Sequence, residues 1–229
     1  MKLLCRNYRY LLSVLLVVFL QGCSTQGFHI KQLAKSDIDM VTDMVWQENQ
    51  QVLIRLLQKL YKRNPSELAK NVAMTVKQRE QMLFQQSGHL RFAELQFAEE
   101  ISAMSLAFDS RFEGDRVFAL MVGLTGMLRH SYNYNDDFFL TDELDAQVLY
   151  NSARNIEVMA WKLKHKKNTA GRAFIISNRR NGVLDNTSFD RLYGKLIQTQ
   201  DLMAKIIADR DNRTINTVLK STLSVFLPI

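Results

Sequence analysis

The most constraining feature of the sequence is an apolar segment that has no polar face. Residues 117–128, VFALMVGLTGML, place apolar side chains on every side of a helix. Such a helix must be surrounded by other parts of the protein, and twelve residues are too few to span a bilayer. We therefore expect a buried central helix, in which Gly123 and Gly126 let a neighbour come close. A short segment that dips into a membrane is the alternative.

Five further segments have apolar residues at helical spacing. They cover residues 38–60, 68–84, 97–108, 148–163 and 192–207. The expected N-terminal caps are Ser36 or Asp37, Asn64, Thr141, and Thr187 or Ser188. Together with the central helix, these segments predict an all-α fold, a single bundle of about six helices. The turn signal Asn181-Gly182 makes a small β-hairpin near 173–186 an alternative to a plain loop.

The first 22 residues have the layout of a secretory signal. Lys2, Arg6 and Arg9 form a positively charged region, and the apolar run 11–20 follows it. As a helix, this ten-residue run would extend about 15 Å, against a hydrocarbon core of about 30 Å. We therefore do not expect a permanent transmembrane span.

Leu20-Gln21-Gly22-Cys23 follows the apolar run and resembles the lipobox of bacterial lipoproteins. The resemblance implies that Cys23 is acylated and freed by cleavage, and that Ser24 directs a Gram-negative lipoprotein to the outer membrane. A secretory signal with an unrelated cysteine is the alternative. The segments FDSRFEGDRVFALMVGL and LYNSARNIEVMAWKL resemble parts of uncharacterised proteobacterial lipoproteins, a resemblance that implies no activity.

These observations predict three parts of the chain. Residues 1–22 are the expected signal peptide, residues 23–35 a lipidated tether, and residues 36–229 an α-helical periplasmic domain. The domain would then be held by its lipid anchor at the periplasmic face of the outer membrane. Acyl chains contribute about 0.8 kcal/mol per buried CH₂, so two or more chains anchor a protein stably.

Cysteine content and charge exclude several classes of function. Cys5 leaves with the signal and Cys23 carries lipid, so thiol catalysis, cysteine–zinc sites and redox relays are excluded. The formal net charge falls from +7 to +4 when the three cations of the signal are removed. With 47% hydrophobic residues, the chain is neither disordered nor a strongly basic nucleic-acid-binding protein.

The sequence contains none of the common catalytic motifs. GxSxG, SxxK, Walker, GxGxxG and HExxH patterns are absent, and the four histidines have no ligand spacing. Asn133-x-Asn135-x-Asp137 resembles the start of a calcium loop, but Phe138 and Leu144 stand where glycine and glutamate are needed. We therefore expect no catalytic residue, no cofactor and no metal site.

Three carboxylates are candidates for cell-wall glycan cleavage, which needs an acid and a second carboxylate. They are Glu94, Glu99 and Glu100. Neighbouring residues of a helix point about 100° apart, so a solvated acidic face is the better interpretation. A cell-wall hydrolase is accordingly only the third functional hypothesis.

The leading hypothesis is a non-catalytic accessory, assembly or adaptor subunit that binds an envelope protein. A periplasmic carrier of an apolar ligand is the alternative, since methionine and phenylalanine side chains can line a lipid cavity. The expected partner-binding residues lie in the loop 131–139 and are Tyr132, Tyr134, Phe138 and Phe139. A basic cluster at 162–167, with Arg172, Arg179 and Arg180 nearby, is interpreted as a solvated helix end rather than a docking site.

Overall fold

A computed structural model describes residues 36–71, 73–139, 142–180, 183–184, 187–211 and 226–228. The expected signal peptide and tether, with Cys23 and Ser24, lie outside these residues. The described residues belong to one compact unit that begins at Ser36. Within the described residues, no helix combines the length and the apolar character needed to cross a membrane.

Helices make up most of the described part of this unit. They are α2 (Asp37–Arg63), α3 (Pro65–Leu68), α4 (Val76–Phe84), the 3₁₀ turn η2 (Ala93–Leu95), α5 (Glu100–Leu106), α6 (Arg116–Ser131), α7 (Ala146–His165) and α8 (Ser188–Asp211). Two short strands, β1 (Arg179–Arg180) and β2 (Val183–Leu184), pair antiparallel with Arg180 opposite Val183. The all-α bundle expected from the sequence is confirmed, with the small hairpin as its only sheet within the described residues.

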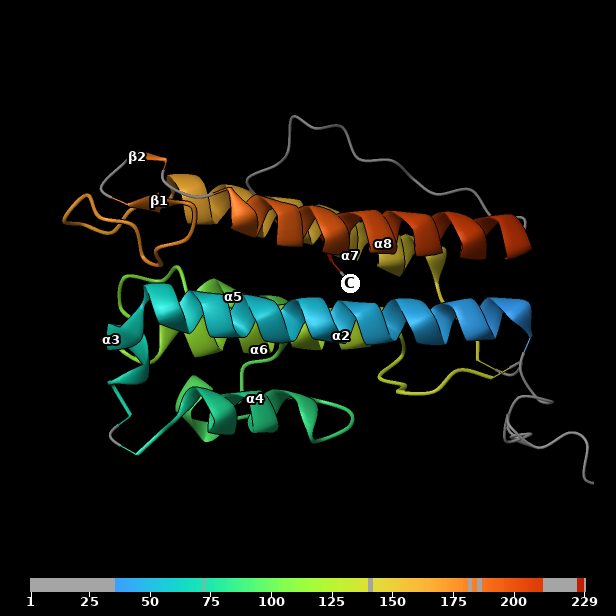
Figure 1. Cartoon of the computed structure of the whole chain (residues 1–229), viewed down its shortest axis with the longest axis horizontal. Helices are drawn as coiled ribbons and strands as arrows, with labels where there is room; N and C mark the ends of the chain where they lie inside the picture. Colours follow the sequence, from blue (N-terminus) through green and yellow to red (C-terminus); the bar gives the residue numbers. More distant parts are fainter. Residues whose placement is uncertain are drawn as a thin grey trace, which may run out of the picture. The chain divides into compact units, whose positions relative to one another are not determined.

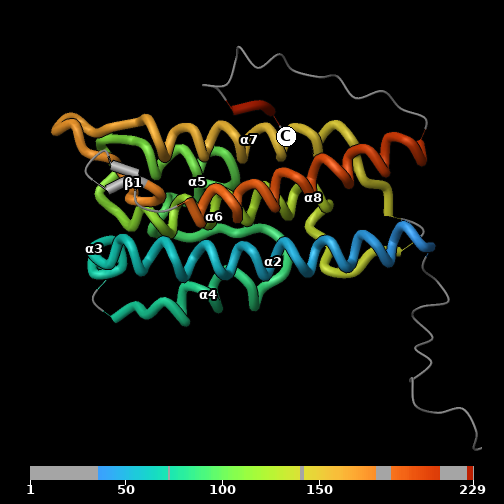
Figure 2. Tube along the Cα trace, turned by 45° about the horizontal axis from the view of Figure 1, so that its top comes forward, coloured from blue at the N-terminus to red at the C-terminus, as the bar shows by residue number. Residues whose placement is uncertain are grey.

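The long helix α6 lies at the centre of this bundle. It contacts α2, α4, α5 and α7, and α8 packs along both α7 and α2. Figure 1 shows α7 and α8 side by side and α2 alongside α6, and Figure 2 shows α4 beside α2. Every residue from Val117 to Arg129 is buried. The buried central helix expected from the sequence is therefore confirmed.

The helix expected over residues 68–84 is not continuous in the structure. A second N-terminal capping signal begins a new helix within this range. Asn64 makes no side-chain cap, and α3 ends at Leu68. The Thr75 hydroxyl then accepts a hydrogen bond from the Gln78 amide, and the Gln78 side chain accepts one from the Thr75 amide. This reciprocal capping box begins a new helix, α4.

Two further boundaries differ from the sequence expectation. The helix expected over 97–108 is only Glu100–Leu106, because Phe97 is exposed and has a left-handed backbone (φ 57°). The cap of α7 is Asp145, not Thr141: its carboxylate accepts hydrogen bonds from the amides of Gln147 and Val148. A carboxylate at this position also interacts favourably with the positive end of the helix dipole.

The contact between α5 and α6 requires a glycine. A Cβ atom on Gly123 would lie 2.4 Å from the Met104 amide nitrogen and 2.5 Å from the Glu100 carbonyl oxygen. Both atoms belong to the backbone of α5, so they cannot move without moving the helix. The expected close approach at Gly123 is therefore confirmed, whereas Gly126 has only ordinary contacts with Glu100.

We expect Gly123→Ala to destabilise the protein by about 1 to 3 kcal/mol, because the new methyl group would push α5 away. The matched control is Gly194→Ala in α8, where a Cβ meets nothing within 4 Å. That change should raise the free energy of unfolding by up to about 1 kcal/mol through helix propensity. Urea denaturation of both variants measures the difference. If both variants changed the free energy of unfolding equally, α5 would not pack on Gly123.

Candidate functional site

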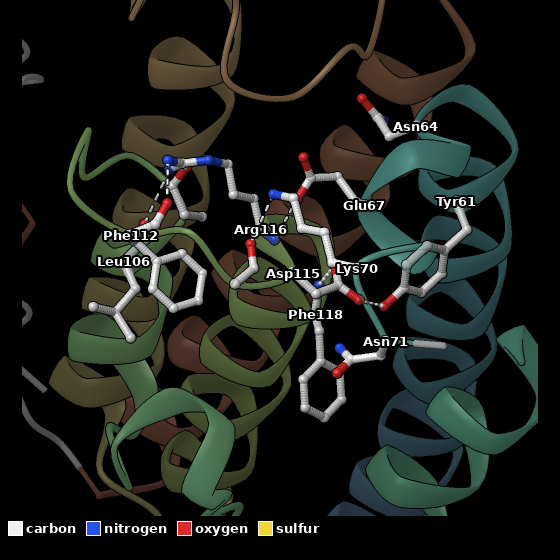
Figure 3. A network of polar contacts seen from close by, with 12 residues as sticks. Tyr61, Asn64, Glu67, Lys70, Asn71, Leu106, Phe112, Asp115, Arg116 and Phe118 are labelled. Carbon is white, nitrogen blue, oxygen red and sulfur yellow. Dashed lines mark hydrogen bonds and ion pairs between the residues drawn. The ribbon is translucent and has the colours of Figure 1, made fainter. Parts of the chain in front are cut away.

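A buried polar network holds the start of α6 against α2 (Figure 3). The Tyr61 hydroxyl donates a hydrogen bond of 2.6 Å to Asp115 Oδ2, and the Phe118 amide donates one of 2.9 Å to Asp115 Oδ1. Arg79 from α4 lies 3.4 Å from the same carboxylate. The side chains of Arg79 and Asp115 have no exposed surface. Three helices therefore meet at one buried ion pair.

Arg79 contacts two carboxylates in this network, Glu94 and Asp115. Both terminal nitrogens of its guanidinium bind Glu94, and the guanidinium lies 3.7 Å from the centre of the Phe118 ring. Burial by itself lowers the pKa of Arg79, but the hydrogen bonds and charges of its acidic neighbours raise the pKa overall. Burial raises the pKa of Asp115, and the hydrogen bond from Tyr61 and the charge of Arg79 offset only part of this rise.

We expect Arg79→Met to lower the free energy of unfolding by about 3 to 5 kcal/mol, because it leaves Asp115 buried without its cation. The matched control is Arg111→Met. Arg111 also pairs with a carboxylate, but its side chain is 89% exposed, so its loss should leave the unfolding midpoint unchanged. Thermal denaturation by circular dichroism compares the two variants. Equal losses would mean that the buried network does not stabilise the fold.

The same corner of the bundle contains a second set of polar contacts (Figure 3). Glu67 Oε2 accepts hydrogen bonds of 2.7 Å from the Arg116 amide and 2.8 Å from Lys70 Nζ. The Arg116 guanidinium donates to the carbonyl oxygens of Ala107 (3.1 Å) and Asp109 (2.7 Å). Burial lowers the pKa of Arg116. These contacts fix Glu67 and Arg116 in place beside an open cleft.

This cleft, called the basic cleft below, has a volume of about 890 Å³. Its lining contains five cationic side chains and one carboxylate: Arg116, Lys164, Lys166, Lys167, Arg172 and Glu67. Lys164 also pairs with Asp190 at 2.7 Å. In the part of the chain that the structure describes, no carboxylate pairs with the other two lysines or with Arg172. The cleft therefore presents uncompensated positive charge.

One wall of the basic cleft is an irregular segment, residues 166–176, that follows α7. Asn64 fixes its end: Asn64 Nδ2 donates to the Ile176 carbonyl (2.8 Å), and the Ile176 amide donates to Asn64 Oδ1 (2.7 Å). Lys167 and Ala173 form an antiparallel bridge within the segment. Ile175 is buried and packs into the core. The hydrogen bonds to the Ile176 backbone and the burial of the Ile175 side chain therefore hold this wall in place.

A second cleft, of about 590 Å³, contains three carboxylates, from Glu94, Asp109 and Glu113. Arg79 binds Glu94, and Arg111 binds Asp109 at 3.0 Å. Hydrogen bonds from Arg111 lower the pKa of Asp109. Glu99 and Glu100, the other carboxylates considered for glycan cleavage, do not line this cleft. Both clefts contain many charged groups, so neither offers an apolar ligand a matching surface.

Two of the four residues expected to bind a partner in the loop 131–139 are buried in the structure. Tyr132 and Phe138 are buried, and Tyr134 and Phe139 are partly buried. The Tyr132 ring lies 5.1 Å from the Trp46 ring and 5.6 Å from the Phe138 ring, between centroids. Aromatic side chains gain more by burial in the core than by exposure in a loop. Tyr132 and Phe138 are therefore not available for contact with a partner.

The basic residues of the sequence are brought together differently from the expectation. Lys164, Lys166 and Lys167 lie at the end of α7 as expected, but they share the cleft with Arg116 from the start of α6. Arg116 was not recognised in the sequence because it opens an apolar helix. Lys162 points elsewhere: its Nζ lies 3.7 Å from the centre of the Phe226 ring.

Comparison with protein-family models, curated proteins and solved structures finds no match to the chain. The residues of the basic cleft and their geometry are therefore what supports a function.

Proposed function

We propose that the protein is a lipid-anchored accessory lipoprotein of the outer membrane that binds an acidic segment of an envelope protein in the basic cleft. In this role it is a non-catalytic adaptor. The observation that supports the proposal is the lining of the cleft, where five cations surround one carboxylate. Complementary charge steers association and selects partners.

The chemistry of the cleft suits carboxylates on an extended chain. Lys166 and Lys167 are exposed and carry mobile ammonium groups, while Arg172 offers a planar guanidinium that can bind a carboxylate with two hydrogen bonds. Asn168 and Thr169 add neutral polar groups to the lining. An acidic peptide segment can use both kinds of contact.

We expect the full chain in detergent to bind a fluorescent, glutamate-rich peptide of about ten residues with micromolar affinity, measured by anisotropy. The triple variant Lys166→Glu, Lys167→Glu, Arg172→Glu should weaken binding at least tenfold. Added salt should weaken wild-type binding as well, because exposed charges are screened over about 8 Å at physiological ionic strength.

The control triple variant changes the net charge equally at exposed positions outside the cleft. It combines Arg55→Glu, Lys77→Glu and Lys205→Glu. We expect this control to bind the peptide nearly as well as wild type. If both triple variants lose binding equally, net charge and not the cleft is responsible. If the cleft binds vesicles that contain anionic phospholipid but does not bind the peptide, the partner is a lipid surface and the adaptor proposal is wrong.

The proposed anchor is tested separately through Cys23. We expect Cys23→Ser to give an uncleaved or soluble protein without acyl chains, so that its distribution in a Triton X-114 partition changes. Its circular dichroism spectrum should retain the helical signal, because Cys23 precedes the helical unit. Unchanged partition of this variant would contradict the lipoprotein assignment without affecting the cleft.

A further inference from the structure

Two histidines and two glutamates meet where α5 begins and α6 ends. His89 Nδ1 lies 2.7 Å from Glu99 Oε2, and His130 Nδ1 lies 3.1 Å from Glu100 Oε2. One ligand atom from each of His89, Glu99 and Glu100 lies within 4.8 Å of the other two. This His–Glu cluster is separate from the basic cleft, whose lining shares none of its residues.

The donors in the His–Glu cluster are those that transition metals prefer. Imidazole nitrogen and carboxylate oxygen bind Zn²⁺ at about 2.0 to 2.2 Å. Ligand atoms in a tetrahedral site are then about 3.3 Å apart. The ligand atoms of the cluster, which lie within 4.8 Å of one another, approach this spacing. Their exposed fractions of 52% for His89 and 22% for Glu99 leave a path for an ion to enter.

Neighbouring side chains hold the second oxygen of each carboxylate. Arg91 Nε donates to Glu99 Oε1, and the Tyr134 hydroxyl donates to Glu100 Oε1. In each case the other oxygen, Oε2, faces a histidine. Burial raises the pKa of Glu99, but its hydrogen bonds with His89 and Arg91 lower the pKa overall. Such outer contacts orient metal ligands in known sites.

The rings of the cluster are also held in place. The Tyr134 ring stacks on His89 with centroids 3.9 Å apart, and its centroid lies 5.5 Å from that of His130. Stacking restricts rotation of both imidazoles. The ligands are therefore ordered before any ion arrives, which reduces the entropy lost on binding.

Backbone strain coincides with the cluster. Glu100 and Tyr134 both have left-handed backbones, with φ of 47° and 58°, although neither is glycine. This conformation is strained for a residue that has a Cβ atom. The Glu100 carbonyl lies where α5 packs closely on Gly123. Strain of this kind often marks a functional site.

We propose that His89, Glu99 and Glu100 bind a divalent transition-metal ion such as Zn²⁺, with His130 positioning Glu100. The sequence predicted no metal site, because these residues are scattered along the chain. The ion would link the loop after α4 to the start of α5. This proposal does not depend on the adaptor function.

The test uses the full chain without a histidine tag, stripped with EDTA and dialysed free of chelator. We expect isothermal titration with ZnCl₂ to show one site per chain with a Kd of micromolar or below. The melting temperature should rise by several degrees with ZnCl₂, since an ion that binds only the folded state stabilises it. Co²⁺ should give visible absorption bands typical of a protein-bound ion.

The variant pair Glu99→Gln and His89→Ala should each weaken Zn²⁺ binding more than tenfold. Both residues are partly exposed, so the melting temperature in EDTA should stay within a few degrees of wild type. The control variants are Glu113→Gln and His165→Ala, which change exposed residues outside the cluster. Absence of Zn²⁺ binding, or equal loss in the control variants, would overturn the proposal. His130→Ala should weaken binding less than His89→Ala; a larger loss would make His130 the primary ligand.

Discussion

The burial of α6 is the constraint on which the rest of the structure depends. A helix that is apolar on every side stabilises the fold only if other elements cover it completely. The charged residues of α6 therefore lie at its two ends, where they find partners that a buried charge requires. Arg116 at the first end contributes to the basic cleft. His130 at the other end belongs to the His–Glu cluster.

Arg129, in the last turn of α6, holds the chain after α4 in place. Its guanidinium donates hydrogen bonds of 2.9 Å each to the carbonyl oxygens of Leu83 and Gly88. Burial lowers the pKa of Arg129. The carbonyl of Gly88 directly precedes His89, so α6 fixes the loop that carries this histidine. The histidine and Glu100 are thus both positioned by the same helix, one through Arg129 and the other through Gly123.

Features that depend on local sequence were mostly predictable, whereas contacts between side chains far apart in the sequence were not. The apolar run of α6 and the Ser36 cap of α2 are local, and so is the missed capping box at Thr75. The His–Glu contacts join residues 10 and 30 positions apart, and the one between His130 and Glu100 forms where α5 packs on α6. Tyr132 was misplaced for the same reason. Its polar neighbours in the sequence suggest a surface loop, but its ring packs on Trp46 from α2.

The basic cleft contains two kinds of cation. One kind stabilises the fold through hydrogen bonds, and the other does not. Arg116 donates to backbone carbonyls and so stabilises the loop before α6. Lys166 and Lys167 are exposed, and the segment that carries them is held by Asn64 and the buried Ile175 instead. Like charges at close range repel one another, so a set of cations without a structural role lowers stability slightly. A bound anionic partner would offset that repulsion, and this cost is the physical reason to assign the cleft a ligand.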